Sequence, residues 1–187
     1  MVRKKFKNVA LNWRKRDIEQ RLFFPGGRYT RVNNLLSGLI GLVLTAIFYG
    51  IVGGTDLSRT FFGQIFLDRG QTQYLVVFLT SWSLAILGLK YLKLRLQRKS
   101  LDLPLIPDEL GFTVSTTSAE QVLKTIQEQV DDPRHFMLTN RVVMALSNLR
   151  NLGRVGDVDE ILRSQAAQDE SAMETSYAMV QGFVWAI

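Results

Sequence analysis

The sequence contains no cysteine and only one histidine, His135. The lack of cysteine excludes a disulfide framework and a thiolate metal site, and a single histidine excludes a histidine cluster that could hold a metal within one chain. Neither a phosphate-binding glycine loop nor a Ser-His-Asp arrangement is present. We expect His135 to be a solvated residue at the start of a helix, and the adjacent acids Asp169 and Glu170 to lie on a helix surface rather than to form a tuned acid–base pair. The sequence therefore predicts neither an enzyme nor a bound cofactor.

Two long stretches of the chain lack charge. Residues 35–54 contain no charged side chain, and residues 74–92 contain none before Lys90. A helix of about 20 residues, rising about 1.5 Å per residue, crosses a hydrocarbon layer about 30 Å thick. The basic lead before the first stretch is too long for a signal peptide. We therefore expect two retained transmembrane helices.

Basic residues are concentrated before the first stretch and after the second, and not in the loop between them. Residues 1–34 contain ten Lys and Arg against two acids, residues 90–99 contain five and no acid, and the loop 55–73 is balanced. The positive-inside rule places the N-terminus and residues 93–176 in the cytoplasm and the loop outside. Long basic side chains that snorkel and aromatic rings at the headgroup level anchor such spans. The expected membrane-interface anchors are Arg28, Arg31, Tyr74, Lys90, Tyr91 and Lys93.

Small and hydroxyl-bearing residues recur inside the spans. In the first span the spacing of four fits close approach of helix backbones, although the ordinary glycine enrichment of membrane helices gives the same pattern. In the second span the hydroxyls favour hydrogen bonds between helices over an ion path, because neither apolar stretch has a carboxylate or histidine at depth. The spaced residues are Ser37, Gly41 and Thr45, then Gly50 and Gly54; the hydroxyls are those of Thr80, Ser81 and Ser83.

The N-terminal arm, residues 1–34, mixes basic residues with Val9, Trp13, Ile18, Leu22 and Phe23. Basic and aromatic residues together are typical of nucleic-acid binding and equally of a helix that lies on anionic lipid. Because the arm is tethered to a membrane span, we favour anionic lipid and expect no nucleic-acid partner.

The segment after the second span is acidic and helical in pattern. A basic flank and proline-containing linker, residues 93–117, precedes it. Within residues 118–176, capping boxes at Ser118–Gln121 and Asp157–Glu160 predict two helix starts, and Pro133 predicts a third. The first two helices carry apolar stripes, which predict packing as a helical bundle. These stripes are Val122, Leu123, Ile126 and Val130, then Leu138, Val142, Leu146 and Leu149.

The last predicted helix changes character at Tyr177. It is polar from Asp157 onwards, whereas residues 177–187 are apolar on all sides. Such a helix is buried in protein or in lipid. It enters a membrane from the cytoplasm, or it docks on the helical bundle as a terminal amphipathic helix.

Two spans, a short outer loop, an acidic helical segment and the closing stretch GDVDEILRSQAAQDESAMETSYAMVQGFVWAI, residues 156–187, together resemble the MotA/TolQ/ExbB proton channel family. The resemblance implies an all-α membrane protein of the bacterial inner membrane. Its long cytoplasmic helix would continue into a third span, which we expect to start at residue 177 and to extend past residue 187. By this resemblance Gly182, Phe183, Trp185 and Ala186 begin the pore helix. The Gly-Thr-Val pore motif of the family is not in the sequence, so no residue is assigned to ion conduction.

The resemblance also implies partners and a function. Family members form homo-oligomers, usually pentamers, around a one-span partner of the ExbD/TolR/MotB type whose aspartate carries the proton. We therefore expect a subunit of a proton-motive-force-driven, stator-type channel, here without its pore-forming half. The alternative is a membrane-anchored scaffold whose cytoplasmic helical bundle recruits a partner protein.

Overall fold

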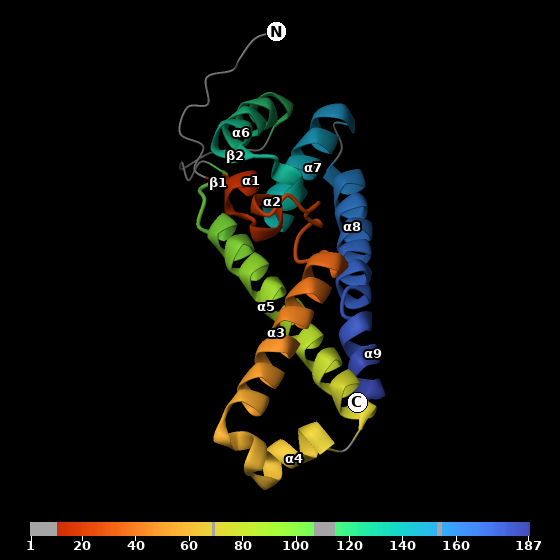
Figure 1. Ribbon diagram of the computed structural model, residues 1–187. Coiled ribbons are helices and arrows are strands. Elements are labelled where there is room, and N and C mark those ends of the chain that lie inside the picture. Colours follow the sequence, from red (N-terminus) through yellow and green to blue (C-terminus); the bar gives the residue numbers. More distant parts are fainter. Residues whose placement is uncertain (1–10, 69, 107–114, 153–154) are drawn as a thin grey trace. The chain divides into compact units, whose positions relative to one another are not determined.

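The computed structural model describes residues 11–68, 70–106, 115–152 and 155–187 (Figure 1). These residues are mostly helical and belong to two compact units. The span unit contains residues 31–92 and 174–187, and the arm unit contains the described residues up to Thr30 and those from Lys93 to Met173.

The span unit contains two helices that are long and apolar enough to cross a membrane. The first, α3, is Asn34–Gly54, and Asn33 caps it by accepting hydrogen bonds from the N–H groups of Leu35 and Leu36. The second lies in α5, Gln71–Leu101. Both predicted spans are therefore confirmed as apolar helices. The helix α5 continues through the basic flank, where we expected a linker, because no proline interrupts the chain before Pro104.

The helices α3 and α5 cross at a close contact (Figure 1). A Cβ atom added to Gly41 would lie 2.8 Å from Trp82 Cα, and Trp82 Nε1 donates a 3.0 Å hydrogen bond to Ser37 Oγ. Close approach is thus confirmed around Gly41, whereas Gly50 and Gly54 face open space. The interhelical hydrogen bond predicted for Thr80 is wrong, because its hydroxyl donates to Val76 O in its own helix.

Two short helices and one terminal helix complete the span unit. The 3-10 helix η1, Asp56–Arg59, and the helix α4, Phe61–Asp68, fill the predicted loop. The terminal helix α9 is Ala178–Ala186. It is separate from α8, Val155–Thr175, because Tyr177 N–H bonds to Glu174 O three residues back. The expectation of one uninterrupted helix is therefore wrong at residues 176–177.

The arm unit is built around two apolar clusters. The helices α6, Thr116–Gln129, and α7, Met137–Leu152, pack side by side and enclose the first cluster. Val122, Leu123, Ile126 and Leu146 are buried there as predicted, whereas Val130 belongs to the second cluster and Leu138 is exposed.

The second cluster contains Trp13, and short elements from distant parts of the chain surround it. The strand β1, Leu11–Asn12, pairs in parallel with β2, Val130–Asp131. The helices α1, Trp13–Arg16, and α2, Ile18–Arg21, follow β1, and the 3-10 helix η2, Pro133–His135, follows β2. The arm is therefore folded into this unit at Leu11 and Trp13 rather than forming one amphipathic helix, although Leu22 and Phe23 are exposed. Val9 lies outside the described residues.

Two helix starts differ from the prediction. Ser115 caps α6 and exchanges hydrogen bonds with Ser118, so the capping box lies three residues earlier than expected. Serine at both positions fulfils the reciprocal bonding that we assigned to Ser118 and Gln121. The helix α8 begins at Val155, so Asp157 lies inside its first turn and is not the cap.

Candidate functional site

The first site of interest joins the second apolar helix to the terminal helix, within the span unit. Lys90 Nζ lies 2.5 Å from Ser176 Oγ and 3.9 Å from the centre of the Tyr177 ring. The Lys90 side chain is only 4% exposed. A buried ammonium group requires such partners, because it loses its hydration. Lys90 therefore fixes the position of the turn that precedes α9.

A second contact lies two helical turns earlier on α5. The Trp82 ring centre is 4.9 Å from that of Phe183 in α9. Residues spaced by four share one face of a helix, so Trp82, the buried Ile86 and Lys90 form one stripe along α5. We call these three residues the α5 stripe. Two of them contact the C-terminal residues: Trp82 contacts Phe183, and Lys90 contacts the turn before α9. We had expected Lys90 to reach lipid headgroups; the structure places it against protein instead.

The second site is a buried charged cluster in the arm unit. Lys93 Nζ lies 2.5 Å from Glu19 Oε2, 3.8 Å from Asp17 Oδ2 and 3.4 Å from Gly27 O. Lys93 is 3% exposed, and both acids are equally buried. The same ammonium lies 5.6 Å from the centre of the Trp13 ring. Lys93, which we also expected at the headgroups, therefore ties the N-terminal arm to the last turns of α5.

The two carboxyl groups of this cluster are not equivalent. Burial raises the pKa of Asp17 above its ordinary value, with Glu19 adding to the effect and Lys93 opposing it. The oxygen Asp17 Oδ2 has no hydrogen-bond partner among the described residues. Burial in this cluster therefore favours the protonated form of Asp17.

His135 borders the same cluster. Its ring stacks on Trp13 at 4.9 Å between centres, and its Nδ1 lies 3.2 Å from Asp132 Oδ2. Burial lowers the pKa of His135, against the attraction of Asp132. His135 is therefore half-buried and not solvated as expected, because the Trp13 ring of α1 stacks on it.

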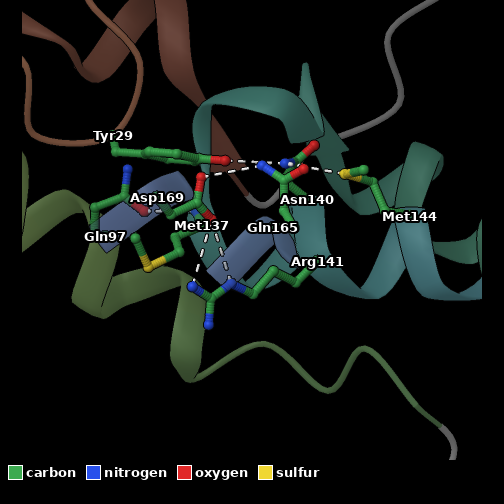
Figure 2. Close-up of polar contacts among 8 residues, drawn as sticks. All are labelled: Tyr29, Gln97, Met137, Asn140, Arg141, Met144, Gln165 and Asp169. Carbon is green, nitrogen blue, oxygen red and sulfur yellow. Dashed lines mark hydrogen bonds and ion pairs between the residues drawn. The ribbon is translucent and has the colours of Figure 1, made fainter. Parts of the chain in front are cut away.

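Figure 2 shows a polar network that links α7 with α8 and with the end of the arm. Asn140 Nδ2 donates a 3.0 Å hydrogen bond to Tyr29 Oη. Arg141 lies 3.4 Å from Asp169 Oδ2, and Gln165 donates to Asp169 Oδ1. Asp169 is buried, so the surface position that we expected for it is wrong. In contrast, Arg163 and Asp159 form an exposed pair, as on a solvated helix face.

Apart from Phe183, the remaining predicted residues lie outside these sites. Arg28 and Arg31 are exposed, and Tyr91 is exposed on α5. Tyr74 stacks on Tyr49 of α3 at 4.5 Å, which joins the ends of the two apolar helices. On α9, Phe183 contacts Trp82, whereas Gly182, Trp185 and Ala186 are exposed, Trp185 by 90%.

Sequence reasoning missed Asp17 and Glu19. They are the only two acids among the first 34 residues, which carry ten basic residues. Two acids in a basic segment are a usable signal, because a buried acid needs a cation and Lys93 is the residue that supplies it here.

The described residues contain no group of three or more His, Asp or Glu placed to hold a metal ion. Neither the protein-family models, nor the curated proteins, nor the solved structures give a significant match to this chain.

Proposed function

We propose that the chain is a subunit of a proton-motive-force-driven, stator-type channel complex in a bacterial inner membrane. The observation that supports this proposal is the contact of α9 with the α5 stripe. It groups the apolar C-terminal residues with the two candidate spans and not with α6 and α7. The resemblance to the MotA/TolQ/ExbB family expects a third span at this place in the chain.

The outer face of α9 supports the same proposal. Val184 and Trp185 are exposed on it, and so is Ile187 just after it. An apolar face of this kind requires lipid or another subunit. In the proposed complex, copies of this chain and a one-span partner provide that cover.

The proposed mechanism assigns proton transfer to the partner. The apolar stretches of α3 and α5 have no Asp, Glu or His, so this part of the chain offers no proton-carrying group at depth. In the proposal this chain surrounds the partner's aspartate, and proton flow drives movement between the two. Lys90 acts as a positioning residue that sets where the third apolar helix begins.

The composition of the complex tests the proposal. The full gene product, purified from its own membranes in detergent and weighed by native mass spectrometry, is expected as a homo-oligomer, five copies by family resemblance. It should carry two copies of a smaller protein with one apolar span. A single copy of the chain bound to a soluble protein would contradict the proposal.

That second outcome would support the alternative, a membrane-anchored scaffold. The observation that favours a scaffold is the arm unit, which has two apolar clusters of its own and needs no third span. In that case residues of the arm unit bind the partner, and the exposed face of α9 meets only lipid.

A further inference from the structure

The helix α4 carries uncovered aromatic side chains. Phe61 is 75% exposed and Phe62 is 49% exposed, and Leu57 of the preceding η1 is also exposed. On a helix with about 100° per residue, Phe61, Phe62 and Ile65 lie within an arc of about 100°. Asp68 borders this arc beside Phe61, and Gln64 lies outside it, about 60° beyond Phe61. Two adjacent exposed phenylalanines on an amphipathic helix mark an interaction surface.

Short connections hold α4 near the end of α3 and the start of α5. It follows α3 after η1, and only Arg69 and Gly70 separate Asp68 from the start of α5. Three chain steps reach at most about 10 Å, so α4 cannot extend far from the ends of the two candidate spans. A Cβ atom on Gly63 would overlap the Leu57 carbonyl, which shows how closely α4 packs on η1.

The helix α4 also folds back on α3. The rings of Phe66 and Phe48 make a T-shaped contact with 5.2 Å between their centres. Phe48 lies six residues before Gly54, the last residue of α3, which is about 9 Å along the helix axis. The aromatic residues of α4 are therefore held beside the last turns of a candidate span.

We propose that α4 is an interfacial helix whose Phe61 and Phe62 side chains insert into the lipid bilayer at the boundary of headgroups and acyl chains. Residues 55–68 carry only Asp56, Arg59 and Asp68, so anionic lipid gains no attraction there. Insertion thus depends on apolar contact and is independent of lipid charge. The exposed aromatic face then has the bilayer as its partner and needs no second protein.

Spin labelling tests this proposal on the full chain. Because the sequence has no cysteine, Phe61→Cys, Phe62→Cys and the control Gln64→Cys each give one nitroxide. The three proteins are placed in vesicles of phosphatidylcholine, with and without phosphatidylglycerol. Labels at positions 61 and 62 should collide with oxygen several-fold more, relative to a water-soluble nickel chelate, than the label at position 64. The ratios should be equal in both lipid mixtures.

Either of two results would overturn the proposal. A label at position 61 that meets nickel as readily as the label at position 64 would place α4 in water. Immobile labels at positions 61 and 62 that meet neither reagent would place a second copy or another protein on this face. Leu57→Cys in η1 gives an independent measurement if a label on α4 disturbs its packing, and the same two results there overturn the proposal.

Discussion

Lys93 Nζ lies 2.5 Å from Glu19 Oε2, in a pair that bridges 74 residues of sequence and is almost completely buried. The contact ties a short helix of the N-terminal arm to the end of a helix that carries a candidate membrane span. Removing one member of a buried ion pair leaves the other charge without compensation, which is far costlier than losing a surface pair.

Glu19→Ala should therefore destabilise the arm unit by about 3–5 kcal/mol. The measurement is a urea titration of the full chain in detergent, followed by a short trypsin pulse that cleaves unfolded arm units. Glu120→Ala, which removes an exposed acid from α6, is the matched control and should shift the midpoint little. A Glu19→Ala midpoint equal to that of the control would show that Lys93 does not depend on Glu19.

The stability of the arm unit should fall as the pH drops below 6.5, the ordinary pKa of histidine. Because burial lowers the pKa of His135 in the folded state, the unfolded chain binds more protons between that lowered pKa and 6.5. Stability therefore increases with pH across this window. The same urea titration at several pH values should show this increase, and His135→Gln should remove it.

Asp17 should change the stability of the arm unit with pH in the opposite direction to His135, and so serves as a control. Its pKa is raised in the folded state, so the folded chain binds more protons than the unfolded chain between pH 3.8 and the folded pKa. The stability that the Asp17 proton contributes is therefore lost as the pH rises through this window. Asp17→Asn should flatten that decrease and leave the histidine-dependent increase in place. If His135→Gln left the pH profile unchanged, the covered position of His135 against Trp13 would be contradicted.

Gly41→Val should push α3 away from α5. The nearest atom to a new Cβ is Trp82 Cα at 2.8 Å, which belongs to backbone and cannot rotate aside. Overpacking of this kind costs about 1–3 kcal/mol. Unfolding of the full chain in mixed micelles of increasing SDS content measures the effect. Gly50→Val, where nothing lies within 4 Å, is the control. Equal midpoints for the two variants would contradict the close crossing.

Lys90→Ala should release α9 from the α5 stripe. A charged hydrogen bond is worth about 1.5–3 kcal/mol, and about 1.4 kcal/mol corresponds to a tenfold change in an equilibrium. In a Phe183→Cys background, Lys90→Ala should thus raise the rate of maleimide labelling about tenfold. Leu87→Ala, at an exposed position of the same helix, should not change the rate. Equal labelling rates in both variants would show that Lys90 does not hold α9.

The apolar helices could be predicted from sequence because the information is local. A charge-free run of about 20 residues and an Asn33 cap suffice to define α3. The start of α6 was harder to predict, since four consecutive Ser and Thr residues, 115–118, can each serve as its cap.

The buried cluster could not be predicted, because its members are far apart in the chain. The pairing of Leu11 with Val130 involves strands of two residues, which are too short to produce an alternating pattern. Lysines near a membrane span ordinarily snorkel, and nothing in the sequence around Lys90 or Lys93 shows that protein covers them. Only the folded arm and the turn at Ser176 reveal their partners.

Proton uptake by vesicles tests the proposed function most directly. The full gene product, purified with its one-span partner and placed in vesicles that contain a pH-sensitive dye, is exposed to an inside-negative potassium diffusion potential. The proposal predicts acidification of the vesicle interior that requires both proteins and exceeds the leak of vesicles with either protein alone. Acidification no faster than that leak, in vesicles that a protonophore still acidifies, would contradict it.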